Sequence, residues 1–203
     1  MAAEEESEMS EVLPREILKP FNKMPVRNAA TVLLVGSYGT GKKQLAKSMV
    51  DVCTDTGLKL QVRTTTSLPL PEENTDTRPR IDYIAFIIDL TNRLSFSTVQ
   101  SAVQCVDVEY FLGRACFVVT NVKGTSDHCV EMEEVSRLAD MYNTMYICGG
   151  IKEGDPDERT TLANRLLQLV EVSAGRKNVS PLLVDLTCRQ LSFQEEQTEF
   201  YTV

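Results

Sequence analysis

Apolar residues gather along the chain in short runs that do not alternate with polar residues. The three longest of these runs lie at residues 30–35, 81–88 and 115–119. A strand is apolar at every position when helices cover both faces of its sheet, as they do in parallel sheets. These runs therefore predict buried strands of a parallel sheet, and residues 145–148 predict a further, shorter strand.

The segment at residues 58–63 has a different pattern. Every second residue is apolar, at Leu58, Leu60 and Val62, and the residues between them are polar or charged. Such alternation is typical of a strand with one covered face, so we expect this strand at an edge of the sheet. Residues 65–80 follow with three prolines and many small polar residues, and they predict a long connection.

Between the predicted strands, apolar residues recur with the spacing of amphipathic helices. The residues that mark these helices are Leu45, Met49, Val52 and Cys53; Val99, Val103, Val106 and Tyr110; and Val135, Leu138, Ala139 and Tyr142. Gly57 is expected to close the first helix, and Ser95 is expected to cap the second. The last long helix has the clearest start, with Asp155 as its cap, Pro156 at its first position and Glu158 reaching back to the cap.

Strands that alternate with helices predict an α/β fold, a doubly wound and mostly parallel sheet with helices on both faces. The 203 residues have the length of one ordinary domain. We assign this domain to residues 25–193, and it includes a final short helix predicted at residues 180–191. Residues 1–24 are expected to form a flexible acidic leader, and residues 194–203 an acidic C-terminal tail.

The composition limits the partners that the chain can take. Its net charge of -8 argues against direct binding to nucleic acid, because sequence-independent affinity for DNA comes from lysines and arginines. No apolar stretch approaches the roughly 20 residues that span a bilayer, and the acidic start is the reverse of a signal peptide. These features predict a cytosolic or nuclear protein without a membrane segment.

Cysteine and histidine usage favours no metal site. The six cysteines are scattered without a Cys-x-x-Cys pair, and several lie inside apolar runs. They predict reduced and mostly buried thiols. His128 is the one histidine, which is too few for zinc sites built on several histidines, and we expect it in a loop near a helix start.

A glycine-rich loop joins the first predicted strand to the first helix. Residues 36–42 read Gly-Ser-Tyr-Gly-Thr-Gly-Lys, which is a Walker A pattern in its required context. Amides between Gly36 and Gly41 would surround a phosphate, and Lys42 would reach the outer phosphates. The next residue, however, is Lys43, where active enzymes place a hydroxyl that binds magnesium. We interpret the loop as vestigial, an inherited glycine turn rather than a live nucleotide site.

The other parts of a GTPase site are missing from the sequence. No Asp-x-x-Gly occurs, residues 120–124 read Thr-Asn-Val-Lys-Gly in place of Asn-Lys-x-Asp, and residues 149–151 read Gly-Gly-Ile in place of Ser-Ala-Lys. We therefore expect no enzyme, no catalytic residue, no metal and no cofactor. An alternative stays open, a degenerate P-loop NTPase that uses Lys42 and Asp89. The apolar strand that ends at Asp89 resembles a Walker B segment, but buried strands often end in aspartate where the chain turns.

Several stretches of the chain resemble the centromere protein M family. The residues that carry the resemblance are 67–71, 78–82, 106–107, 111–117 and 167–175. It covers about residues 20–192 and implies a small-GTPase-like, P-loop NTPase fold without GTPase activity. It also implies a nuclear protein at the centromere and kinetochore of the chromosome, a subunit of the constitutive centromere-associated network assembled with centromere proteins H, I and K.

A compact fold without catalytic parts must work through its contacts. The resemblance implies a noncatalytic structural subunit that binds and stabilises centromere protein I within an H-I-K-M subcomplex, for kinetochore assembly and chromosome segregation. Membranes and small-molecule substrates are not expected among its partners. The candidate binding faces are the connection at 67–80, the loop at 121–128 and the helix that carries Val99 to Tyr110.

Overall fold

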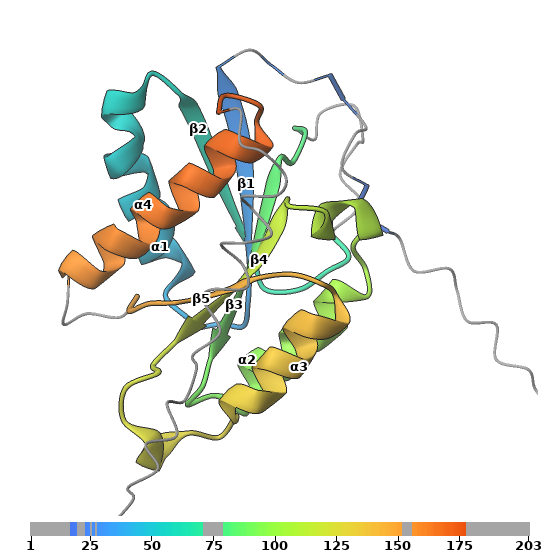
Figure 1. Cartoon of the computed structure of the whole chain (residues 1–203), viewed down its shortest axis with the longest axis vertical. Helices are drawn as coiled ribbons and strands as arrows, with labels where there is room; N and C mark the ends of the chain where they lie inside the picture. The colour runs from blue at the N-terminus through green and yellow to red at the C-terminus, as the bar shows by residue number, and fades with distance from the viewer. Residues whose placement is uncertain are drawn as a thin grey trace, which may run out of the picture.

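Five parallel strands form a single sheet, with helices on both of its faces (Figure 1). The structure is a computed structural model, and it describes residues 17–19, 23–24, 26, 28–70, 79–151 and 156–177. The strand order is β2-β1-β3-β4-β5. This arrangement confirms the predicted doubly wound α/β fold, and every strand pair in the described part of the chain is parallel.

The elements follow the predicted alternation of strands and helices. The strands are β1 (Ala29–Val35), β2 (Lys59–Thr65), β3 (Tyr83–Asp89), β4 (Ala115–Thr120) and β5 (Tyr146–Cys148). The α-helices are α1 (Lys42–Cys53), α2 (Arg93–Val103), α3 (Met132–Met141) and α4 (Pro156–Ser173). Three short 3-10 helices are η1 (Thr54–Thr56), η2 (Val108–Phe111) and η3 (Thr125–Asp127).

The sheet separates two hydrophobic cores. On one face Phe86 of β3 packs in a core with Val99 of α2 and with residues of α3. On the other face Ile87 of β3 packs with Leu45 of α1 and Leu166 of α4. Successive side chains of a strand point to opposite faces, so a strand with helices over both faces of the sheet buries all of its side chains. This explains why β3 and β4 are buried along their whole lengths.

β2 is the edge strand that the alternating pattern predicts. Among the described residues it pairs with β1 alone. Leu60 and Val62 are half-buried on the α1 side of the sheet, whereas Lys59 is exposed. The half-covered environment accounts for the alternation of apolar and polar residues.

The start of α2 corrects one prediction. Asn92 caps this helix, because its backbone is extended and its side chain accepts a hydrogen bond from the Leu94 N–H at 3.0 Å. Ser95 lies inside the first turn, where its hydroxyl accepts a hydrogen bond from the Asp89 N–H at 2.8 Å. The prediction of Ser95 as the cap is therefore wrong. Its hydroxyl ties the helix back to β3 instead.

The end of α2 corrects a second prediction. The helix stops at Val103, and Tyr110 lies in η2 rather than in the same helix. Val106, between them, forms an isolated parallel bridge with Leu18. The helical spacing misled because Val103, Val106 and Tyr110 all face the same core, although the backbone turns between them. The Tyr110 hydroxyl donates a hydrogen bond to the Ile81 carbonyl at 3.1 Å.

Gly57 closes the short helix η1, which follows α1 directly, rather than α1 itself, and other predictions concern the ends of the chain. α4 begins at Pro156 as predicted, whereas Asp155, the helix expected at residues 180–191 and the tail at 194–203 lie outside. Of the residues expected to form the leader, residues 17–19 and 23–24 are described, and Leu18 bonds through its backbone to Cys105 and Asp107.

The described cysteines are free thiols. Cys53, Cys105 and Cys116 are buried, Cys148 is half-buried and Cys129 is exposed. Burial raises the pKa of the Cys116 thiol to about 12, which keeps it protonated and unreactive. The prediction of reduced and mostly buried cysteines is confirmed for these residues. The sixth, Cys188, lies outside them.

Candidate functional site: a phosphate loop closed on its own lysine

The loops that follow the parallel strands meet at the carboxyl edge of the sheet. β1 lies between β2 and β3, so the chain leaves β1 toward one side of the sheet and later returns to its other side. Doubly wound folds bind their ligands at this kind of switch point. The glycine loop at residues 36–41 follows β1 and precedes α1, and it occupies this position. The arrangement is that of a small-GTPase-like fold.

Lys42 is turned into its own loop. Its Nζ atom donates hydrogen bonds to the carbonyl oxygens of Gly36 at 2.6 Å and Ser37 at 2.5 Å. The side chain is buried, and burial lowers the pKa of its ammonium group. The ammonium group that would bind a phosphate in an active enzyme donates here to backbone carbonyls of the loop.

Two further residues, Thr40 and Ile151, restrict the loop. Thr40 donates a hydrogen bond from its hydroxyl to the Ser37 carbonyl at 3.0 Å, in parallel with Lys42. Gly41 has a φ of 81° and lies against Ile151, whose Cγ2 atom would overlap a Cβ atom at position 41. Ile151 is buried in the α1–α4 core. An isoleucine therefore covers the start of α1, beside the amides that would bind an anion.

Asp89 has local partners at the end of β3. Its Oδ1 atom accepts hydrogen bonds from the Thr91 N–H at 3.0 Å, the Thr91 hydroxyl at 2.7 Å and the Asn121 Nδ2 at 2.6 Å. These bonds link the β3–α2 loop to the loop that follows β4. The geometry favours the interpretation of Asp89 as a structural residue over a role as a magnesium ligand.

The loop that follows β4 is held by contacts within itself and with the start of α4. Asn121 has a φ of 58°, and its carbonyl oxygen lies 2.8 Å from the Nε2 atom of His128, which donates when it carries the proton. Lys123 forms an ion pair with Glu158 in the first turn of α4. The Glu158 carboxylate also lies 2.5 Å from where a Cβ atom on Gly150 would be. His128 lies in a loop before α3, as predicted.

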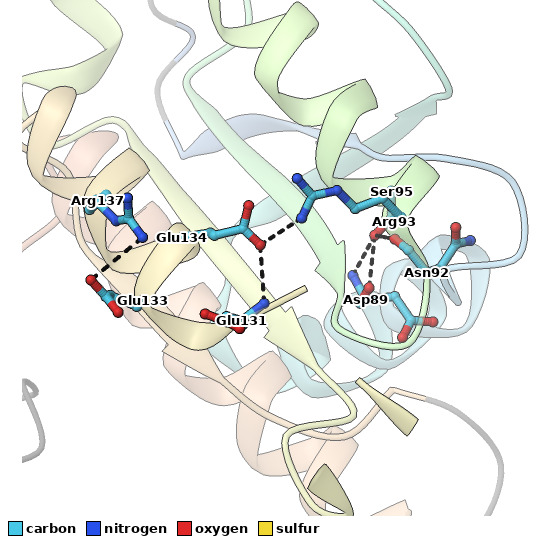
Figure 2. A network of polar contacts seen from close by, with 8 residues as sticks. All are labelled: Asp89, Asn92, Arg93, Ser95, Glu131, Glu133, Glu134 and Arg137. Atoms are coloured by element: carbon cyan, nitrogen blue, oxygen red, sulfur yellow. Dashed lines mark hydrogen bonds and ion pairs between the residues drawn. The ribbon is translucent and has the colours of Figure 1, made fainter. Parts of the chain in front are cut away.

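A second polar network joins the β3–α2 loop to α3 (Figure 2). Arg93 donates from Nη1 to the Glu134 Oε2 at 2.6 Å, and its guanidinium lies over the Phe96 ring. The same Glu134 oxygen accepts a hydrogen bond from the Glu131 N–H at 3.2 Å, which completes a capping box at the start of α3. Arg93 and, after it, the Glu131 N–H lower the pKa of the Glu134 carboxyl.

The residues of the glycine loop that the sequence singled out do come together. Gly36, Gly41 and Lys42 form one turn, and Asp89 ends the neighbouring strand β3. Sequence reasoning missed Ile151 as the residue that covers Gly41, and it gave Glu158 a capping role rather than the pair with Lys123. The glycine pair at 149–150 was the available signal, because adjacent glycines indicate close approach of side chains from elsewhere.

Exposed apolar side chains lie near the amino ends of the strands, at the end of the sheet opposite the glycine loop. We call Ile17, Val108, Leu112 and Met141 the amino-edge patch. Val108, the first residue of η2, is 72% exposed, Leu112, which follows η2, is 75% exposed, and Met141 is 75% exposed at the end of α3. Leu18 bonds beside Val106, and the rings of Phe111 and Tyr142 lie 4.7 Å apart, so the segments that carry the patch are neighbours.

The described residues contain neither a cluster of metal-ligating side chains nor a membrane-spanning helix. Within these residues, no group of three or more histidine, cysteine, aspartate or glutamate side chains is placed to hold a metal ion. No helix among them has the length and apolar character needed to cross a bilayer.

The comparisons with known proteins decide the family. The model of the family Centromere protein M (CENP-M) matches residues 15–191. The chain belongs to the centromere protein M family. Centromere protein M of Xenopus laevis is 37% identical over 159 residues, which are 78% of this chain and 86% of the relative. The Homo sapiens protein is 36% identical over 161 residues, 78% of this chain and 85% of the relative.

A third relative extends the match toward the ends of the chain. Centromere protein M of Danio rerio is 33% identical over 186 residues, or 91% of this chain and 98% of the relative. Membership in the centromere protein M family makes this chain a centromere protein of the chromosome. Its closed phosphate loop is then a feature of a centromere protein, and the question becomes what the protein binds.

Proposed function

We propose that this chain is a noncatalytic structural subunit of the inner kinetochore, which binds and stabilises centromere protein I within a subcomplex with centromere proteins H and K. Kinetochore assembly and chromosome segregation are the processes it serves. Family membership supports the centromere role. The single observation that supports a noncatalytic role best is the position of Lys42, whose ammonium group is hydrogen-bonded to its own loop.

The alternative, a degenerate NTPase that uses Lys42 and Asp89, has less support. Both side chains already form short hydrogen bonds within the protein, which a phosphate or a metal ion would have to share or replace. Ile151 would also have to move from Gly41 to open the loop. Each of these changes exposes or unpairs buried groups, which costs free energy.

The amino-edge patch offers a binding surface in place of a nucleotide site. Isolated apolar residues are common on protein surfaces, but several on neighbouring segments indicate contact with another protein. The patch includes Val108, which lies within residues 99–110, the segment expected from the sequence as one of three binding faces. We propose that centromere protein I covers this patch.

Reconstitution tests this proposal. Purified full-length chain is mixed with centromere proteins H, I and K, and assembly is followed by size-exclusion chromatography. We expect the wild type to join the complex and the double variant Val108→Asp, Met141→Asp to lose it. The control is Val50→Asp, which changes an exposed valine of α1 on another part of the surface.

The outcomes separate the surface from the function. A wild-type chain that stays apart from the other three proteins would remove the proposed function. If the wild type and both variants bind equally well, the function stands and the amino-edge patch is the wrong surface.

A further inference from the structure

The outer edge of β2 is the longest regular row of backbone groups that the described strands leave without a strand neighbour. β2 pairs with β1 at every residue from Lys59 to Thr65, in continuous register and without an inserted residue. It contains no proline. A straight edge strand of this kind presents donors and acceptors that another chain can pair with.

Two hydrogen bonds determine which groups of β2 face outward. The Lys59 N–H donates to the Asn28 carbonyl at 2.8 Å, and the Thr65 carbonyl accepts from the Gly36 N–H at 3.3 Å. In a parallel pair, alternate residues of a strand direct both backbone groups to the same neighbour. The odd-numbered residues of β2 therefore bond to β1, and the outward groups are those of Leu60, Val62 and Thr64.

The side chains of β2 give its two faces different chemistry. Leu60 and Val62 are half-buried on the face covered by α1. Lys59 is exposed and Arg63 is half-buried on the other face, so this face carries two basic residues along the strand. A strand paired beside them would place acidic residues on the charged face and apolar residues on the α1 face.

The neighbouring helix adds to the local positive charge. Lys43 and Lys47 are exposed on α1, which packs against β2, and Asp51 is the exposed acidic residue on the same helix. The chain as a whole has a net charge of -8, so this edge differs in sign from the protein average. Opposite charge favours and orients an acidic partner.

We propose that β2 receives an extended, acidic segment of a partner protein as an additional strand. The inference rests on the proposed function only in that this chain acts by binding other proteins of the inner kinetochore. Backbone hydrogen bonds from Leu60, Val62 and Thr64 supply the binding, and the exposed Lys59 favours a segment with an acidic residue beside it.

Amide hydrogen exchange tests the proposal on the full-length chain, alone and in complex with centromere proteins H, I and K. The amides of Leu60, Val62 and Thr64 should exchange rapidly in the free chain and slow by about tenfold or more in the complex. The amides of Gln61, Arg63 and Thr65 bond to β1 and serve as internal controls that are protected in both states. Unchanged exchange of the even-numbered amides in a complex that does form overturns the β2 proposal alone. Failure to form any complex overturns the proposed function with it.

Two substitutions at Thr64 form a matched pair of variants. Thr64→Pro removes an outward N–H without touching the bonds to β1, and prolines are tolerated in edge strands on that side. Thr64→Val keeps the N–H and is the control. We expect Thr64→Pro to weaken the complex by about tenfold while Thr64→Val binds as the wild type does. Equal binding by both variants overturns the proposal.

A charge-reversal variant keeps the test decisive if the proline disturbs folding. Lys59→Glu reverses an exposed charge, leaves the backbone edge intact and should weaken binding by about threefold at low salt. Other occupants give distinct results. Protection in the free chain that is lost on removal of residues 194–203 identifies the chain's own tail. Protection that rises with protein concentration identifies a second copy. Either result overturns the proposal of an acidic partner.

Discussion

Lys42 holds the phosphate loop from inside, through hydrogen bonds to the Gly36 and Ser37 carbonyls. A lysine in this place is read from sequence as a ligand for phosphate, and its contacts here are those of a structural residue. Buried carbonyl groups that lose their donor cost free energy, so the lysine has a reason to be present without any nucleotide.

The first prediction concerns Lys42→Ala. The change leaves the Gly36 and Ser37 carbonyls without this donor, and we expect a loss of about 1–3 kcal/mol in the free energy of unfolding. Urea denaturation followed by circular dichroism measures it. Lys43→Ala is the control, because Lys43 is exposed on the same helix and should change stability by less than about 0.5 kcal/mol. Equal effects of the two changes would contradict a structural role for Lys42.

The second prediction compares two glycines of the loop. Gly39 and Gly41 both have a φ of 81°, so alanine at either position is strained by about 1–2 kcal/mol. A Cβ atom at position 39 meets nothing within 4 Å, whereas at position 41 it overlaps the Ile151 side chain. We expect Gly41→Ala to be the more destabilising by about 1–3 kcal/mol.

Ile151→Ala provides the cross-check for this comparison. Combined with Gly41→Ala, it should restore part of the lost stability, because the smaller side chain leaves room for the new methyl group. Strict additivity of the two changes in urea denaturation would show that the contact does not decide the cost.

At the scale of elements, side chains from one helix complete the start of the next. Arg93 at the start of α2 pairs with Glu134, and Glu134 in turn caps α3 through the Glu131 N–H (Figure 2). The sequence predicted both helices but neither the pair nor the cap of α2. The partners are separated by 41 residues, and only the packing of the two helices brings them together.

The third prediction is a pH dependence that belongs to this link. The pKa of Glu134 is lower in the folded protein than its ordinary value of 4.5, so the ionised carboxyl stabilises the fold above that pH. The contribution disappears as the pH falls through the folded-state pKa. Glu134→Gln should therefore lower the free energy of unfolding at pH 7, and the difference from the wild type should vanish at low pH.

A pH series of urea denaturation curves measures this difference. Glu133→Gln is the control, because Glu133 forms a longer pair of 3.5 Å with Arg137 on the exposed surface of the same helix. A Glu134→Gln effect that stays constant down to acid pH would show that the ionised carboxyl is not its source.

On the scale of the whole molecule, the sheet separates two edges with different properties. The carboxyl edge carries the closed loop and the ties among Asp89, Asn121 and the neighbouring loops. The amino edge carries the exposed apolar patch around η2. If the chain has the noncatalytic role proposed above, its partners bind at surfaces other than the glycine loop.

The fourth prediction follows from the proposal that the glycine loop binds no nucleotide. Millimolar ATP or GTP with magnesium should leave the melting temperature of the full-length chain unchanged, since a ligand stabilises a protein only if it binds the folded state. Differential scanning fluorimetry measures it. A rise in the wild type that is absent from Lys42→Ala would contradict the noncatalytic proposal and favour the alternative NTPase.

The sequence by itself determined the alternation of strands and helices and the edge position of β2. These features are read from local patterns, because burial on both faces, on one face or on a helix stripe each leaves its own spacing of apolar residues. It also determined the family, through stretches that match centromere protein M along most of the chain. The sequence also shows that Lys43, rather than a residue with a magnesium-binding hydroxyl, follows Lys42.

Only the tertiary structure decided where the side chains at the loops point. Lys42 turns into its loop, Ile151 covers Gly41 and Glu158 reaches Lys123, and the spacing of apolar residues predicts none of these contacts. The length of α2 was decided in the same way, because Val103 and Tyr110 face one core from different elements. Periodicity records which residues are buried, whereas the partner of each residue depends on how distant segments pack.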